Sequence, residues 1–220
     1  MDAYKFLRPG AVGRFSGFAW PMPHASEPGP WIEVEGELAL CEAGIHACRL
    51  GDLPYWLDEE LWAVELGGEI GAEPHAVVAR RGRLVRRIDA WTRETARDFG
   101  KACMMRTRDH AVEALRAAGL PREAERLAAT ASTGDVEAAG LAAVAAAGAA
   151  GDVLAERVAY AAVTSARHAA VELDTPTYIA YPAFAAYSAT VAGDSRDSAG
   201  GWDAERAWQA DWLAARLDLE

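Results

Sequence analysis

The amino-acid sequence changes character near residue 92, and this change constrains the fold more than any single motif. Before it, Gly, Pro, Trp and segments of alternating apolar and polar residues dominate, whereas alanine-rich segments dominate after it. Alternation with a period of two is typical of strands, and apolar spacing near 3.6 is typical of helices. We therefore expect an α+β protein, with a small antiparallel or mixed β unit over residues 1–92 and an alanine-rich helical bundle over residues 93–220 packed against it.

Alternating segments predict the strands of the first unit. Residues 52–57 are typical of a short helical turn, with Asp52 as its N-terminal cap. The expected strands are residues 3–7, 31–35, 44–49, 61–70, 76–81 and 83–88, the last two joined across Gly82.

Gly, Asp and Pro residues divide the second unit into five or six expected helices. The first spans about residues 93–118 and the last about residues 203–217. Pro182 is expected to kink or divide the fifth helix, because proline lacks a backbone donor and clashes with the preceding turn. The other boundary signals are Gly119, Pro121, the cap candidates Asp135 and Asp152, and the pair Thr175-Pro176.

Alanine side chains let helices approach closely, so we expect the aromatic side chains of the second unit to fill the remaining gaps. Trp208 and Trp212 lie four positions apart, Ala215 and Leu219 continue their stripe on one face of the last helix, and we expect this stripe to pack against the β unit. The expected fillers are Phe99, Tyr160, Tyr178, Tyr181, Phe184, Tyr187, Trp208 and Trp212.

Composition limits the class of protein. The chain has 220 residues, of which 51% are hydrophobic, and this is enough for a packed core. No apolar run is long enough to span a bilayer, and the first residues lack the pattern of a signal peptide. Three cysteines do not make a closed disulfide framework. We expect a cytoplasmic protein with reduced thiols and no membrane partner.

The formal net charge of −11 argues against nucleic acid as a partner, because phosphate binding depends on clustered Lys and Arg. One arginine-rich segment is a local exception, and guanidinium groups bind phosphates and carboxylates. Arg80 and Arg81 are therefore candidate ligand-binding residues. The alternative is a solvated, charged hairpin edge. The full segment contains Arg80, Arg81, Arg83, Arg86 and Arg87.

The most distinctive string runs from Cys41 to Cys48, and its side chains suggest three interpretations. On a strand, His46 and Cys48 point to the same face, and Cys41 approaches from the preceding turn. The three are a candidate zinc site. Cys41 and Cys48 are alternatively a redox pair, and the remaining interpretation is a strand that packs these side chains in the core. Zinc needs a fourth ligand, for which the candidates are His24, His75 and Cys103.

The first 90 or so residues resemble a bacterial and phage domain family. That family has a Cys-x-x-Gly-apolar-His-small-Cys string before a Val-Glu-x-x-Gly-Glu strand, matched here by Cys41 to Cys48 and by Val64 to Glu69. Tyr4-Lys5-Phe6-Leu7 and Phe15-Ser16-Gly17-Phe18 are similar to it as well. The family has no agreed function, so the resemblance implies a fold and its boundaries more than an activity.

A Gly-x-His strand, a short helix and an apolar strand with a Glu resemble the middle of ADP-ribosyltransferase-like folds. The resemblance implies that His46 holds a nicotinamide dinucleotide (NAD) and that Glu65 orients its ribose. The Ser-Thr-Ser and Glu-x-Glu strings of those enzymes are absent from this sequence. His46 and Glu65 are therefore candidate catalytic residues on a fold that does not by itself fix the function.

The second unit resembles the alanine-rich helical immunity proteins found beside bacterial polymorphic toxins. Three pieces carry the resemblance: Arg108 to Ala111, Arg167 to Ala170, and the closing Glu205 to Gln209 with Leu213 behind it. The resemblance implies that a cognate protein such as a toxin is the partner. His110 and His168 are then candidate ligand-binding residues in a cleft between helices.

Two classes of function follow. The first is a protein-binding or immunity-type module, for which we expect no cofactor. The alternative is a small enzyme that acts on a nucleotide or a related small molecule through the His46 face, with NAD or zinc as its cofactor. Phosphate-binding loops, the serine-hydrolase elbow and the His-Glu-x-x-His motif are absent.

Overall fold

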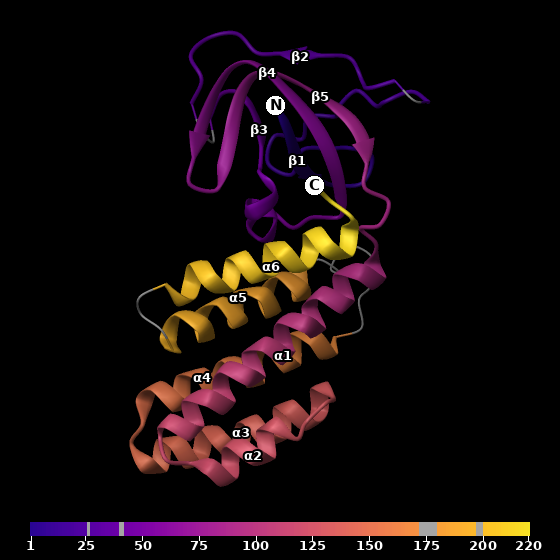
Figure 1. Ribbon diagram of the computed structural model, residues 1–220. Helices are drawn as coiled ribbons and strands as arrows, with labels where there is room; N and C mark the ends of the chain where they lie inside the picture. The colour runs from indigo at the N-terminus through magenta and orange to yellow at the C-terminus, as the bar shows by residue number, and fades with distance from the viewer. Residues whose placement is uncertain (26, 40–41, 172–179, 197–199) are drawn as a thin grey trace. The chain divides into compact units, whose positions relative to one another are not determined.

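The computed structural model of the protein describes residues 1–25, 27–39, 42–171, 180–196 and 200–220 (Figure 1). The chain forms two compact units, one of Met1–Thr92 with Ala210–Glu220 and one of Arg93–Gln209. Strands precede residue 92 and long helices follow it, so the predicted α+β class is confirmed.

The first unit is built on a five-stranded antiparallel sheet. Strand order is β1-β4-β5-β2, and β3 also pairs with β5. A short 3-10 helix, η1, precedes β4. The elements are β1 (Asp2–Leu7), β2 (Ile32–Glu33), β3 (Ile45–Ala47), η1 (Leu50–Tyr55), β4 (Glu60–Glu73) and β5 (Ala76–Arg87).

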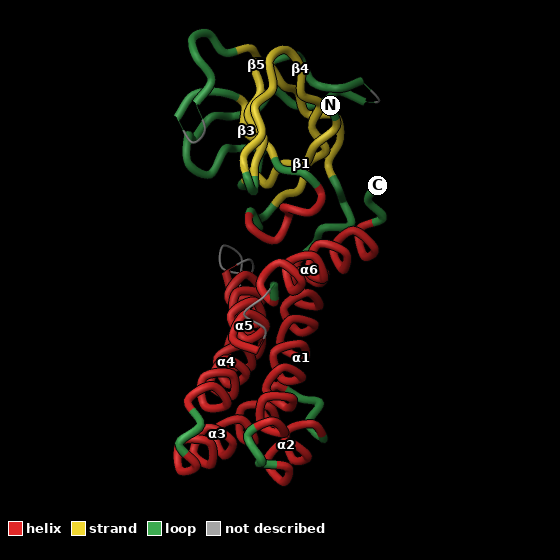
Figure 2. Tube along the Cα trace, turned by 60° about the vertical axis from the view of Figure 1, so that its left-hand side comes forward, coloured by secondary structure: helices red, strands yellow, loops and turns green. Residues whose placement is uncertain are grey.

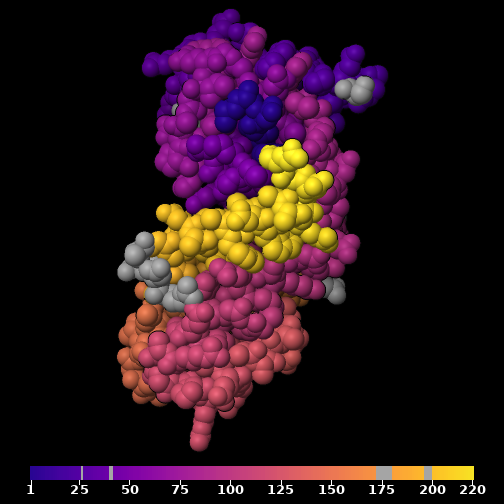
Figure 3. Space-filling model, viewed as in Figure 1, coloured from indigo at the N-terminus to yellow at the C-terminus, as the bar shows by residue number. Residues whose placement is uncertain are grey.

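The sheet closes on itself between β1 and the end of β3 (Figure 2). Tyr4 and Cys48 exchange two backbone hydrogen bonds of 2.8 Å, N–H to carbonyl in each direction. Strands β1, β4, β5 and β3 therefore form a small barrel, which is closed at the outer edge of β1 by the pairing of Tyr4 with Cys48. The C-terminus belongs to the same unit: the Tyr4 hydroxyl donates to the main-chain oxygen of Glu220 at 2.9 Å, and the two chain ends lie side by side in Figure 3.

Alternation along the strands fills the barrel interior with apolar side chains. Gly82 is required here, because a Cβ at this position would lie 2.6 Å from Ile45 Cγ2 and 3.2 Å from Leu66 Cδ2. Strand β5 is continuous from Ala76 to Arg87 and passes through Gly82. The interior residues are Ala3, Leu7, Trp20, Ile45, Ala47, Trp62, Val64, Leu66, Val77, Ala79 and Leu84.

The prediction that Asp52 caps η1 is wrong. Arg49 is the N-cap residue, and no side chain caps this helix. Asp52 instead lies inside η1, where its carboxylate is 2.8 Å from Nε of Arg49. Arg49 in turn donates from Nη2 to the carbonyl oxygens of Glu73 and Pro74. The pair therefore fixes the β4–β5 turn to the short helix.

Within the described residues, six helices follow the sheet, and none of them is long and apolar enough to cross a bilayer. Gly119 ends the first helix region with a φ of +74°, as predicted for a C-terminal glycine, and Pro121 opens the next helix. The helices are α1 (Arg93–Ala117), α2 (Pro121–Ala128), α3 (Thr133–Ala150), α4 (Val153–Ala170), α5 (Ala180–Arg196) and α6 (Gly201–Leu217).

One of the two predicted aspartate caps is correct. Asp152 caps α4 by accepting a hydrogen bond from the Ala155 N–H. Asp135 does not cap α3, because Ser132 occupies that position and accepts from the Asp135 N–H. The Asp135 carboxylate accepts a hydrogen bond from the Ser132 hydroxyl in return. Thr175-Pro176 lies outside the described residues, and Pro182 lies within α5, whose described part begins at Ala180.

The core of the helical unit is mostly alanine, and the prediction that aromatic side chains fill it is wrong for three of them. Tyr160, Phe184 and Tyr187 are 57%, 51% and 54% exposed, whereas Phe99 is fully buried. Tyr181, Trp208 and Trp212 are half-buried, and Tyr178 lies outside the described residues. Close approach of the helices explains the three exposed side chains. A Cβ at Gly140 of α3 would lie 2.8 Å from Val163 Cγ2 of α4, so little room remains between these helices for larger groups.

The buried stripe of α6 also differs from the prediction. Trp208 and Trp212 are half-buried, whereas the fully buried side chains are Glu205, Gln209 and Leu213. These three are spaced at intervals of four and share one face of the helix. A sequence stripe of large apolar residues therefore does not identify the inner face when polar side chains find partners inside.

Candidate functional site

The Cys41–Cys48 string contributes one strand to the barrel wall. Ile45 and Ala47 point into the barrel, so His46 points outward. Cys48 is 2% exposed, and its thiol lies 3.4 Å from the carbonyl oxygen of Tyr4. Burial raises the pKa of Cys48 to about 12, so the thiol stays protonated at neutral pH.

The zinc and redox hypotheses both depend on Cys41, which lies outside the described residues. Among the described residues, no three His, Cys, Asp or Glu side chains are close enough together to hold a metal ion. Burial, and then the nearby Lys5 ammonium, lower the pKa of His46. The three-ligand site therefore stays a prediction.

His46 and Glu65 are not brought together by the sheet. His46 pairs with Val78 and Glu65 pairs with Arg83, so they flank β5 at points five residues apart. At about 3.3 Å per residue, this is roughly 16 Å along the strand. The Glu65 carboxylate is also engaged by Arg83, with an N–O distance of 2.6 Å. The two side chains do not form one site in this fold.

The arginines of β5 are held by the sheet around them. Arg80 pairs with Glu69 at 2.8 Å and donates to the carbonyl oxygens of Val34 and Gly36. The guanidinium carbons of Arg81 and Arg83 lie 4.7 and 4.6 Å from the ring centre of Trp31. Such pairs are typical of a structured hairpin surface, which is the second of the two interpretations given above.

His110 lies in a buried polar network of the helical unit. Its Nε2 is 2.9 Å from the carboxylate of Glu205, and the Arg106 guanidinium lies 2.9 Å from the same oxygen. Burial alone would raise the pKa of Glu205, but the hydrogen bonds from His110 and Arg106 outweigh it and leave the pKa below its usual value. Glu205 is therefore ionised and paired at neutral pH.

The network continues along α6 to α5. Gln209 donates to the Ala186 carbonyl oxygen at 2.9 Å and to the Thr190 hydroxyl at 3.2 Å. Its own carbonyl oxygen accepts from Arg206 at 2.9 Å. The motif residues that resemble immunity proteins, Glu205 to Gln209, thus join three helices and hold the fold together.

His168 occupies a different place from His110. Its ring stacks on Phe184 with 4.9 Å between ring centres, and Tyr181 is 6.0 Å away. Burial lowers the pKa of His168, so the neutral imidazole is favoured near pH 7. His110 and His168 therefore do not line a common cleft: the first is in the core network, and the second supports exposed Phe184.

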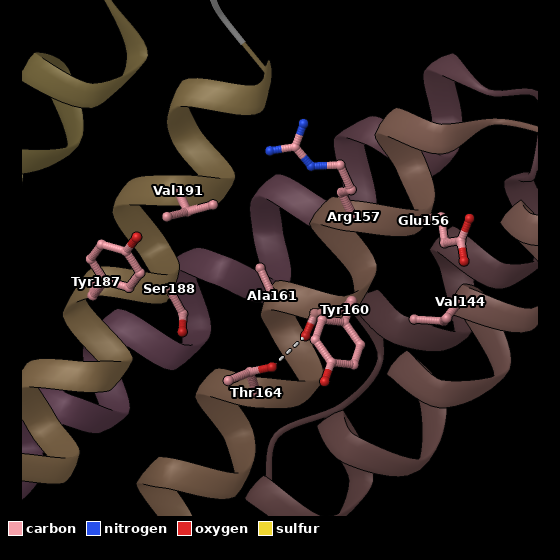
Figure 4. A pocket seen from close by; sticks show the side chains of 9 residues that line it. All are labelled: Val144, Glu156, Arg157, Tyr160, Ala161, Thr164, Tyr187, Ser188 and Val191. Carbon is pink, nitrogen blue, oxygen red and sulfur yellow. Dashed lines mark hydrogen bonds between the residues drawn. The ribbon is translucent and has the colours of Figure 1, made fainter.

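A groove runs along the surface of α4 and α5 in the helical unit, with a volume of about 520 Å³ (Figure 4). Its lining is spaced at three- and four-residue intervals on both helices, so each helix presents one continuous face. We call it the α4–α5 groove. The lining residues are Val144, Glu156, Arg157, Tyr160, Ala161, Thr164, Tyr187, Ser188 and Val191.

The two charged residues of the groove lie on opposite sides of α4. Arg157 extends toward α5, whereas Glu156 points toward α3, where a Cβ added to Gly148 would lie 3.6 Å from its carboxylate. Arg157 is exposed and forms no ion pair within 4.0 Å in the described part of the chain. The Thr164 hydroxyl donates to the Tyr160 carbonyl oxygen at 3.0 Å. The groove is thus aromatic and apolar, with one cation that no described carboxylate neutralises.

The sequence does not predict the groove, because its pattern places Tyr160, Phe184 and Tyr187 in the core. A signal was present, since Arg157, Tyr160 and Thr164 recur at helical spacing and so do Phe184, Tyr187 and Val191. Aromatic residues and Arg are enriched at protein interfaces, so a helical face that carries both is a candidate binding surface.

The fold and the groove together define an α+β protein with a small closed barrel and an alanine-packed helical unit that exposes an aromatic surface. The chain matches no family model, no curated protein and no solved structure.

Proposed function

We propose that this protein is a protein-binding module of the immunity type, and that it contacts its partner through the α4–α5 groove. One observation carries the proposal: Tyr160 and Tyr187, which line the groove, and Phe184, one turn before Tyr187 on α5, are each more than half exposed. Exposed aromatic clusters are costly in water and are enriched at protein interfaces.

The alanine core supports this proposal, because it is complete without these aromatics. Ala143, Ala159 and Ala162 are fully buried, and the helices already approach closely at Gly140. The three aromatic side chains are therefore not needed to fill this core. Large rings that a fold does not need for its core are the kind of residue that forms binding hot spots.

Photo-crosslinking tests the proposal in the source cell. Tyr187 is replaced by p-benzoylphenylalanine, and the matched control carries the same residue at Phe15, which is 86% exposed in the other unit. We expect a discrete protein crosslinked from position 187 and not from position 15. Its purified form should bind the chain, and the Tyr160→Ser/Tyr187→Ser variant should weaken that binding by about tenfold or more.

The immunity character has its own readout. The crosslinked protein should arrest growth when it is expressed alone and should lose this effect when the chain is co-expressed. A partner that is bound at the groove without being toxic would contradict the immunity part and leave the binding part intact. Absence of any crosslink above the Phe15 control would contradict both.

A further inference from the structure

We propose that the occupant of the α4–α5 groove is an amphipathic helix of the partner, which packs apolar side chains on Tyr160 and Tyr187 and places a carboxylate against Arg157. This inference rests on the proposed binding function and specifies the chemistry of the partner.

The geometry of the groove favours a helix. Arg157, Tyr160, Ala161 and Thr164 follow one face of α4, and Tyr187, Ser188 and Val191 follow one face of α5. From Arg157 to Thr164 this face is about 10 Å long, or two helical turns at 1.5 Å per residue. A helix laid along such a groove anchors itself at i, i+3, i+4 and i+7.

The groove offers little to an extended peptide or a small molecule. A strand gains affinity by pairing with a free sheet edge, and the backbone of α4 and α5 is already paired within the helices. A small ligand needs to be enclosed on most sides, whereas the aromatic walls here are more than half exposed. The occupant that fits the groove is therefore an elongated surface of a partner protein with apolar side chains.

The charge of the groove indicates that the partner helix carries an acidic side chain. Arg167, the other arginine of α4, is neutralised by Glu137 of α3 at 2.8 Å. Arg157 has no such ion pair within the described residues, and Asp194, one turn beyond Val191 on α5, forms none with it. A carboxylate on the partner would pair with the guanidinium beside aromatic surface, where water is excluded and such bonds are strongest.

The same charge argues against a second copy of this chain as the occupant. A copy would bring another Arg157 with no counter-charge, and Glu156, the acidic residue of the groove, lies on the α3 side of α4. Like charges across an interface oppose association. The partner is therefore a different protein, with an acidic amphipathic helix.

The probe is a phage-displayed library of three-turn helices on a rigid scaffold, with randomised surface positions and no bias toward either charge. It is selected on the full chain and counter-selected on the Tyr160→Ser/Tyr187→Ser variant. We expect the enriched helices to carry apolar residues at i, i+3, i+4 and i+7 and an Asp or Glu beside them. Circular dichroism of each variant verifies that the helical fold is retained.

Charge reversal then tests the contact with Arg157. Arg157→Glu should weaken the best helix by about tenfold, and replacing the acidic residue of that helix by Lys should restore binding to the variant. The matched control is Arg122→Glu, a reversal at an exposed arginine of α2 outside the groove, which should leave affinity unchanged.

The outcomes separate this inference from the proposed function. Helices that depend on the two tyrosines but are not acidic, or are unaffected by Arg157→Glu, overturn the inference and leave the binding function standing. A selection that yields no helix dependent on the tyrosines, together with no crosslink from position 187, overturns both.

Discussion

The carboxylate of Glu205 lies 2.9 Å from Nε2 of His110, although 95 positions separate the two residues in the chain. An ionised carboxylate only accepts, so Nε2 carries the proton and donates. Arg106 donates to the same oxygen from the adjacent turn of α1. This contact joins α1 to α6 inside the helical unit, where Glu205 is only 1% exposed.

Glu205→Gln should lower the free energy of unfolding by about 1.5–3 kcal/mol, because it removes the buried charge that accepts hydrogen bonds from His110 and from the partly buried Arg106. Urea unfolding measures this. The matched control is Glu137→Gln, which breaks another Glu–Arg pair, with Arg167, at 2.8 Å but at a more exposed position. It should cost about 1 kcal/mol or less. Equal costs for the two variants would refute a structural role for the buried network.

The Glu205 contribution should also depend on pH. Its pKa is lowered in the folded state, so the stabilisation is present above the ordinary value of 4.5 and is lost as pH falls through the folded value. The stability difference between wild type and Glu205→Gln should therefore shrink as the pH falls below that ordinary value. A constant difference across this range would contradict the ion pair.

Lys5 should give the barrel unit a rise in stability at alkaline pH. It pairs with Trp62 on the interior side of β1, donates to the His46 carbonyl oxygen and lies 5.4 Å from the Trp20 ring centre. Burial lowers the pKa of Lys5 from 10.5 to about 8. Between these values the unfolded chain holds more protons, so stability rises with pH. Unfolding measured just below and well above the folded pKa should show this gain in wild type and not in Lys5→Met.

Two glycines of α3 should respond in opposite directions to alanine. At Gly148 a Cβ meets atoms no closer than 3.6 Å, so Gly148→Ala should add about 0.5–1 kcal/mol through helix propensity. At Gly140 the Cβ would lie 2.8 Å from Val163, and overpacking should outweigh that gain by about 1–2 kcal/mol. Thermal unfolding of the two variants ranks them, and a stabilised Gly140→Ala would show that α3 and α4 can separate freely.

Saturating NAD should leave the thermal midpoint of the protein unchanged. The candidate residues for that ligand, His46 and Glu65, flank β5 at points five residues apart, and Glu65 is paired with Arg83. A ligand at about a hundred times its dissociation constant would add about 2.7 kcal/mol. A clear upward shift in differential scanning fluorimetry would favour the enzyme alternative over the binding module.

The sequence predicted the strands and most helix boundaries because those depend on local chemistry. Gly119 and Asp152 act through backbone geometry and a cap within a few residues. The inner face of α6 was not predictable in this way, because Glu205 and Gln209 are buried only through partners on α1 and α5. Long-range pairing of polar groups leaves little trace in local periodicity.

The candidate site was missed for a related reason. Aromatic residues at helical spacing predict a buried face, and only the close contact of α3 and α4 at Gly140 shows that the core has no room for them. Whether Tyr160 is buried or exposed therefore depends on how closely the alanines allow neighbouring helices to pack. The distance between the helices is a property of the folded unit and not of any one segment.

The alanine core has a consequence for the entropy of recognition. Alanine has no side-chain rotamers to lose or to regain, so the interior beneath the α4–α5 groove has few alternative packings. A surface supported in this way is preorganised, and a partner need order little more than the exposed rings themselves. Substitutions within the groove should therefore change mainly the dissociation rate, and the rigid alanine layer below should keep the association rate nearly constant.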